Sequence, residues 1–233
     1  MQFLAGNYPV DLVLLGLLAA FLVLRLRSVL GKRTGLERPA APPPGTRRPG
    51  PVVETRAEPA TPPARREVPA PETATGLVLN RIRDRERGFD PRSFLEGAEA
   101  AFRRIVQAYA EGDRATLRQA LTPDAFAAFE GAIAAREAAG EVQRAEIRTV
   151  TAMNIVEATL VEETGAGGIW RAGIEVRIVS DQVSLVLDRA GQPVSGTDAV
   201  TELADSWTFE RLLGAPRSAD GGFGWRLAAA RSA

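Results

Sequence analysis

The 233-residue sequence contains no cysteine and no histidine. Their absence excludes disulfides, thiol nucleophiles, Cys/His zinc sites and His-based catalytic triads. It also removes the side chain that most often transfers protons near neutral pH. A metal site would have to be built from carboxylates alone, and acid–base catalysis would need carboxylates or a tyrosine. We therefore expect a protein that is not an enzyme, with no catalytic residues, no metal site and no cofactor.

The 29 basic residues balance 29 acidic residues, and Lys32 is the single lysine among them. The two signs are unevenly spread, because residues 1–80 hold ten basic and six acidic residues, a net charge of +4. Residues 81–233 carry the compensating −4. This negative balance argues against nucleic acid as a partner, since domains that bind nucleic acid usually present a basic face to the phosphates.

One long apolar run lies near the N-terminus. Leu12–Leu24 is uncharged throughout, and its extension to Tyr8–Leu26 gives nineteen residues with Asp11 and Arg25 near the ends. A bilayer core needs about 20 helical residues. A cleaved signal peptide would carry positive charge before the apolar run, whereas here the basic residues follow it. A buried core helix would show a polar face, which this run lacks. We predict an uncleaved single-pass anchor in residues 1–30, with the N-terminus outside and the rest in the cytoplasm.

A proline-rich segment follows the anchor. Eleven of the sixteen prolines fall between Pro39 and Pro71, mixed with alanine, threonine, arginine and glutamate. Such a composition buries too little apolar surface to offset the entropy of ordering. We therefore predict a disordered linker over residues 31–76 that acts as a semi-rigid spacer.

We assign residues 77–233 to one folded domain, in which helices come first. Apolar residues recur at three- and four-residue spacing after Asp90, which is placed to cap a helix, and Gly112 is placed to end it. A short helix is expected over Arg114–Leu121. A third helix is expected to begin at Thr122 and to end at Gly140.

After Gly140 the pattern changes to alternation and β-branched residues, with turn signals between the segments. We expect strands over Glu146–Val150, Ile155–Val161, Ile169–Ile178, Gln182–Asp188, Ala199–Leu212 and Gly224–Ala229. Helices followed by strands predict an α+β domain with the helices packed on a curved antiparallel sheet. Such an arrangement commonly leaves a pocket between the two layers.

The start of the domain combines apolar and arginine side chains. On a helix these residues would form a short interfacial segment that lies on anionic lipid. The alternative is an ordinary first helix of the domain, whose arginines are solvated and paired with neighbouring acids. The residues predicted to contact the membrane are Leu77, Val78, Leu79, Arg81, Ile82, Arg83, Arg85 and Arg87.

Aromatic and acidic residues alternate along the predicted strands. Trp207 and Phe209 are two residues apart and so share one face, where they are expected to pack in the core or, alternatively, to line a pocket. Burial of a carboxylate in such a pocket would raise its pKa and fit it for a general base. The strand carboxylates with that potential are Glu157, Glu175, Asp188 and Asp205. Exposed strand carboxylates are far commoner, so catalysis is the least favoured interpretation.

Several segments in order resemble the TimA family, bacterial relatives of the Tim-44-like domain of a mitochondrial inner-membrane import-motor tether. These segments are Ala19–Gly35, Phe94–Asp113, Leu121–Gly140, Asp205–Leu213 and Trp225–Ser232. The resemblance implies a cone-shaped α+β domain of the nuclear-transport-factor-2-like type with an apolar pocket. It also implies a scaffold role at the bacterial inner membrane, affinity for anionic lipid such as cardiolipin, and membrane contact through the first helices of the domain.

Together these observations predict an inner-membrane-anchored adaptor that assists protein translocation or membrane-protein biogenesis. Its expected partners are the inner membrane, through anionic lipid, and a protein of the translocation or insertion machinery. The alternative is a lipid or small-molecule carrier that uses the pocket, with catalysis third. The sequence does not indicate an oligomeric state.

Overall fold

The structure, a computed structural model, describes residues 64–163, 167–214 and 224–232. The predicted anchor (residues 1–30) and residues 31–63 of the predicted linker lie outside these ranges. Within them, no helix is both long enough and apolar enough to cross a bilayer.

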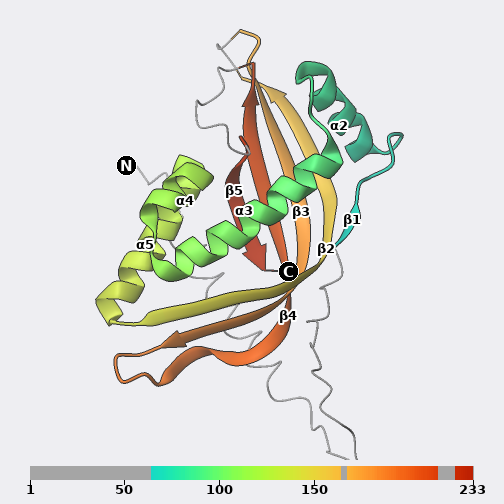
Figure 1. Cartoon of the computed structure of the whole chain (residues 1–233). Coiled ribbons are helices and arrows are strands. Elements are labelled where there is room, and N and C mark those ends of the chain that lie inside the picture. Colours follow the sequence, from blue (N-terminus) through green and yellow to red (C-terminus); the bar gives the residue numbers. More distant parts are fainter. Residues whose placement is uncertain (1–63, 164–166, 215–223, 233) are drawn as a thin grey trace, which may run out of the picture. The chain divides into compact units, whose positions relative to one another are not determined.

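Four helices pack against a five-stranded sheet (Figure 1). In chain order the elements are β1 (Arg65–Glu67), α2 (Ala74–Arg85), α3 (Pro91–Glu111), α4 (Arg114–Ala120), α5 (Pro123–Ala139), β2 (Val142–Glu162), β3 (Trp170–Leu187), β4 (Pro193–Leu213) and β5 (Arg226–Ser232). The strands lie side by side in that same order, and all neighbours are antiparallel except the parallel pair β1–β2. The predicted α+β class, with helices on a mostly antiparallel open sheet, is confirmed.

The helix boundaries follow from local capping. The side chain of Asp90 accepts a hydrogen bond from the Ser93 amide at the start of α3, and the Thr122 hydroxyl accepts one from the Ala125 amide at the start of α5. Gly112 and Gly140 end these helices with φ angles of 73° and 71°. Glycine adopts this left-handed conformation without the steric cost that a β-carbon would add.

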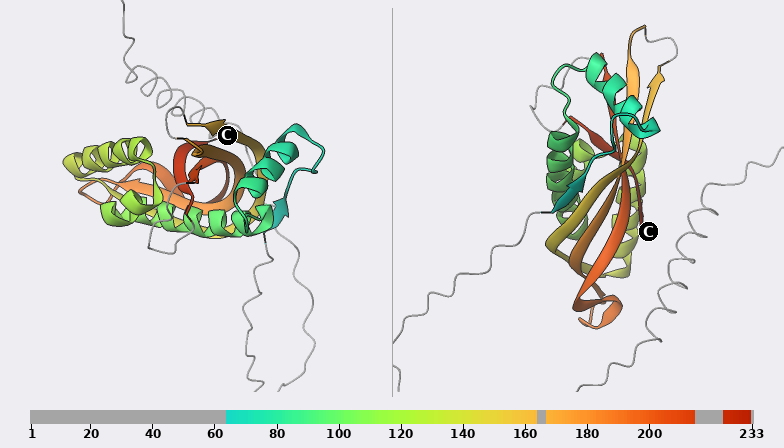
Figure 2. Two further views of the ribbon diagram at one scale, coloured as in Figure 1. Left: turned by 90° about the horizontal axis from the view of Figure 1, so that it is seen from above. Right: turned by 90° about the vertical axis from the view of Figure 1, so that its right-hand side faces the viewer.

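The sheet has fewer and longer strands than expected. Glu146–Val150 and Ile155–Val161 belong to the single strand β2, in which register shifts interrupt the pairing with β3 at three places. The expected turn at Ser180 lies inside β3, where the backbone continues to pair with Val150 on one side and Leu203 on the other. Bulges of this kind bend a strand without ending it, which accounts for the strong curvature of the sheet (Figure 2).

Secondary structure in the described residues begins before residue 77. β1 pairs with Ala152–Asn154 of β2, and the Arg66 guanidinium lies 2.9 Å from a carboxylate oxygen of Glu99 on α3. The Thr73 hydroxyl caps α2 by accepting from the Gly76 amide at 3.0 Å. These contacts order the last part of the segment that was expected to be linker.

The core lies between α3 and the helix-facing side of the sheet. Phe102 and Ile105 of α3 pack with Ile174 and Ile178 of β3, and all four are fully buried or nearly so. At one end of this core, an aromatic cluster joins α3, β4 and the start of β5. Its members are Phe89, Phe94, Phe209 and Trp225, with ring centroids 5.0–6.2 Å apart. One continuous core therefore holds the four helices on the sheet.

Candidate functional site

The apolar residues predicted to contact lipid lie mostly against the domain itself. Leu79 and Ile82 are buried in the core, and Val78 is partly buried against it. Leu77 is the exception, with 55% of its surface exposed. The apolar face of α2 therefore packs mainly against β2. Of the four apolar residues, Leu77 alone is exposed and could contact a membrane.

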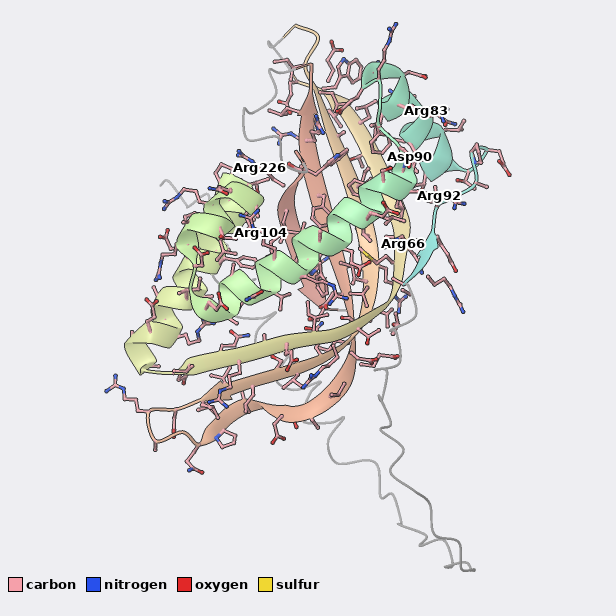
Figure 3. All side chains as sticks on the ribbon, viewed as in Figure 1. Arg66, Arg83, Asp90, Arg92, Arg104 and Arg226 are labelled. Carbon is pink, nitrogen blue, oxygen red and sulfur yellow. The ribbon has the colours of Figure 1, made fainter. Side chains whose placement is uncertain are left out.

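The four predicted arginines of this stretch are exposed. Arg83 donates to the Asn80 side chain at 2.8 Å, and the Arg85 guanidinium lies 3.8 Å from the centre of the Trp170 ring. Arg92 and Arg104 on α3 are exposed as well, and Figure 3 shows them on the helical layer together with Arg83. We call Arg81, Arg83, Arg85, Arg87, Arg92 and Arg104 the α2–α3 arginines.

None of the α2–α3 arginines forms a salt bridge within the part of the chain that the structure describes. Hydrogen bonds lower the pKa of the Asp90 and Asp113 carboxyl groups, and the nearby Arg92 and Arg104 lower it further, so the charges of these two arginines are partly balanced by acidic neighbours. Sequence reasoning missed Arg92 and Arg104, because it considered membrane contact only within residues 77–87. A helical-wheel plot of α3 carries this signal, since Arg92 and Arg104 fall away from the stripe of Phe94, Phe102 and Ile105.

The C-terminal end of α2 is fixed to the sheet by a half-buried ion pair. The Arg211 guanidinium of β4 lies 2.7 Å from a carboxylate oxygen of Glu86, and the two side chains are 18% and 13% exposed. The cation–π contact of Arg85 with Trp170 lies next to it in the sequence. These contacts fix the orientation in which α2 presents its arginines.

Trp207 and Phe209 point into the core. They are 5% and 0% exposed, and the Trp207 ring meets Phe102 edge-on with ring centroids 4.8 Å apart. Phe209 meets Phe94 in the same way at 6.0 Å. These side chains fill the space between α3 and the sheet where an apolar pocket was expected.

A cavity of about 550 Å³ lies at the other end of α3, between that helix and the first half of β2. Most of its lining surface is apolar, and its charged residues are Glu111, Glu146, Asp198 and Arg144. The Glu146 carboxylate is already paired with the Arg148 guanidinium at 2.8 Å. Glu111 accepts a hydrogen bond from Gln107, another lining residue, at 2.9 Å. Neither Trp207 nor Phe209 is among the lining residues.

Three of the four candidate strand carboxylates either have a hydrogen-bond or ion-pair partner or lie exposed on the surface. Glu175 forms a salt bridge with Arg231 at 2.9 Å, and Asp188 accepts hydrogen bonds from the backbone amides of its own turn. Glu157 is exposed on β2. These residues are accounted for without a catalytic role.

Asp205 is the inward carboxylate. It pairs across the sheet with the buried Ile178 and lies on the same face as Trp207. Burial raises the pKa of Asp205, and hydrogen bonds from Ser232 and Gln182 partly offset that rise. The Ser232 hydroxyl donates at 3.3 Å, and Gln182 also donates to Ser180 at 2.8 Å. Asp205 therefore belongs to a hydrogen-bonded network with Gln182 and Ser232, which lies at the edge of the core beside β5.

No group of acidic residues within the described ranges could hold a metal ion. The arrangement instead offers exposed arginines on the helices and, at the other end of α3, a cavity whose lining includes three acidic residues. Both suit binding to charged partners.

Comparison with known proteins adds one match to a family. Residues 75–232 match the family described as Tim44-like domain. Among solved structures, the chain is similar to the crystal structure of the intermembrane-space region of the chloroplast protein ARC6. That similarity has 16% identity and a TM-score of 0.41, and it covers 62% of this chain and 96% of the other. No curated protein sequence matches the chain.

Proposed function

Because this chain belongs to the Tim44-like domain family, we propose that it is a membrane-anchored adaptor that assists protein translocation or membrane-protein biogenesis. The match over residues 75–232 is the observation that carries this proposal, since it spans nearly all of the described fold. The curved sheet covered by helices is also consistent with a nuclear-transport-factor-2-like cone. The family is generally non-catalytic, in agreement with the structural environments of the strand carboxylates.

The proposed location is the bacterial inner membrane, with one pass and a cytoplasmic domain. Support comes from the apolar run Leu12–Leu24 and from the basic residues that follow it, beginning at Arg25. Anchoring would confine the domain to the bilayer surface and raise its effective concentration near membrane partners without any new contact.

Contact with anionic lipid such as cardiolipin is the second part of the proposal, and here the structure shifts the emphasis. With Leu79 and Ile82 buried, binding would rest on the charge of the α2–α3 arginines and on Leu77 alone. A basic side chain close to an anionic surface contributes about 1 kcal/mol. Each of the six arginines that reaches the bilayer would add to this attraction, and none of them would need to insert.

In-cell crosslinking of the full chain, with mass spectrometry of the bound proteins and lipids, tests the adaptor function. A chain shortened to residues 1–63 is the control, because it lacks every described element. We expect components of the translocation or insertion machinery to be recovered with the full chain alone. Recovery of a lipid or metabolite without protein would contradict the adaptor function and favour the carrier, whose site would then be the cavity at the end of α3.

Lipid contact has a separate test. The full chain in nanodiscs should show slower amide hydrogen exchange in α2 and in the first turns of α3 when cardiolipin replaces neutral lipid. Arg83→Glu/Arg92→Glu should abolish that protection, because it reverses two exposed charges. Arg144→Glu/Arg177→Glu, an equal charge change at exposed positions of β2 and β3, should retain it. Equal protection in both double variants would contradict lipid contact through α2 and α3.

A further inference from the structure

One edge of the sheet has no partner strand over half the length of β4. The first half of β4, residues 193–204, pairs with β3 on one side. β5 covers the other side from Asp205 to Glu210 and no further. Among the described residues nothing else lies along this edge (Figure 1). An uncovered edge presents backbone amide and carbonyl groups that can pair with an added strand.

This edge is acidic. Between Pro193 and Glu210 the chain has no arginine or lysine, whereas Asp198 and Glu202 are exposed there. The neighbouring strand adds to the charge, because Asp181 of β3 lies opposite Glu202. We call residues 193–204, with Asp181, the acidic edge. A second copy pairing on it would bring like charges together, which disfavours self-association.

The acidic edge also borders the cavity at the end of α3, because Asp198 is one of the residues that line it. The register of β3 and β4 slips between Gln182 and Ser184, so that residues 198–200 bulge opposite a single residue. Asp198 lies in this bulge and lines the cavity of about 550 Å³ together with Glu111 and Glu146. Val194, Val200 and Leu203 add exposed apolar surface along the same stretch.

These features together define what would fit. A strand added to the sheet sends alternate side chains to opposite faces. One face of a strand beside the bulge would direct its side chains toward the cavity, where a guanidinium or ammonium group would meet the exposed Asp198. The apolar side chains of the edge would contact residues on either side. Backbone pairing would supply affinity, and the exposed carboxylates of Asp198 and Glu202 would select for positive charge.

We infer that the acidic edge binds an extended, basic segment of a partner polypeptide by strand addition, with an arginine or lysine side chain beside Asp198. This inference rests on the proposed adaptor function and names the surface and the chemistry of its protein partner. The cationic helices and the acidic edge would then serve different partners, the former lipid and the latter polypeptide.

The test uses the full chain in nanodiscs of neutral lipid and a labelled ten-residue peptide of alternating valine and threonine. Two arginines replace threonines on one face of the peptide, and the comparison peptide carries glutamates there. Fluorescence anisotropy should show binding of the arginine peptide and at least tenfold weaker binding of the glutamate peptide. Hydrogen exchange should slow at amides of residues 194–204 when the arginine peptide is added.

Charge reversal at the edge supplies the matched pair of variants. Asp198→Lys/Glu202→Lys should raise the Kd for the arginine peptide about tenfold, because an attractive edge becomes a repulsive one. Glu157→Lys/Glu162→Lys makes the same change at exposed positions of β2 and should leave the Kd within about twofold. All four side chains are exposed, and thermal melts of both variants verify that they fold.

Absence of binding, equal loss in both double variants, or protection that maps away from residues 194–204 would overturn the inference. So would a concentration-dependent dimer, seen by sedimentation, that Asp198→Lys/Glu202→Lys dissolves, since the edge would then belong to a second copy. If any of these results accompanies continued recovery of machinery components by crosslinking, strand addition is wrong and the adaptor function stands. If crosslinking of the unmodified full chain recovers no component of the machinery, the adaptor function itself is refuted.

Discussion

Truncation of Trp207 to alanine distinguishes a core residue from the lining of a ligand site. The side chain is 5% exposed, and its ring lies against Phe102 at 4.8 Å between centroids and near Phe209 at 6.2 Å. Removal of a buried tryptophan costs about 3–5 kcal/mol, from lost burial and from the cavity left behind. In a domain of this size, 1 kcal/mol lowers Tm by about 2–4 °C. We therefore expect Trp207→Ala to lower the Tm of the domain by about 6–20 °C.

The assay is thermal and urea unfolding of the full chain followed by circular dichroism, with Phe102→Ala and the double variant completing a cycle. The edge-to-face contact should appear as a coupling of about 1 kcal/mol between the two positions. Trp170→Ala is a useful control, because Trp170 is only partly buried and lies beneath Arg85. A fall in Tm no larger than that of Trp170→Ala, with no coupling to Phe102, would refute the assignment of Trp207 to the core.

Two further predictions concern charged groups. Burial holds the pKa of Asp205 above its usual value, so the native state binds this proton more tightly than the unfolded chain does. The stabilisation that the protonated Asp205 carboxyl gives is complete below the pKa it has in the unfolded chain. It is lost as the pH rises through the higher pKa it has in the folded protein. Asp205→Asn should therefore be more stable than the wild type at pH 7 in urea titrations and no more stable at pH 3; a constant difference across that range would contradict the pKa shift. Arg211→Met should lower the free energy of unfolding by about 2 kcal/mol, because it removes the guanidinium that lies 2.7 Å from the largely buried carboxylate of Glu86. A change within about 0.5 kcal/mol in the same titrations would show that the ion pair does not hold α2 in place.

The parts of the fold that the sequence predicts well are those decided locally. Asp90, Gly112, Thr122 and Gly140 act on the backbone within a few residues, so the bounds of α3 and α5 follow from the sequence alone. The α+β class follows from the change of period after Gly140. In contrast, the turn expected at Ser180 is not formed, because pairing with both neighbouring strands outweighs the local preference of serine and aspartate.

The candidate site was harder to predict for the same reason. An amphipathic pattern at residues 77–82 shows that an apolar face is needed without showing what covers it, and the structure covers most of it with β2. The pairing of β1 is invisible in a proline-rich segment, since three residues carry no periodicity. The acidic edge depends on the order of strands, because Asp181 and Glu202 come together only when β3 and β4 pair.

The short strand β1 determines how the domain would respond to mechanical force. Whatever pulls on the chain before Ala64 acts first on three residues that pair with Ala152–Asn154 and on the Arg66–Glu99 ion pair. A pull along the strand loads these bonds together in shear, whereas a pull away from the sheet opens them one after another. The junction would therefore hold against tension in one direction and yield in the other. Its release would free the residues between Ala64 and Thr73 from the sheet while α2, capped by Thr73, stays folded.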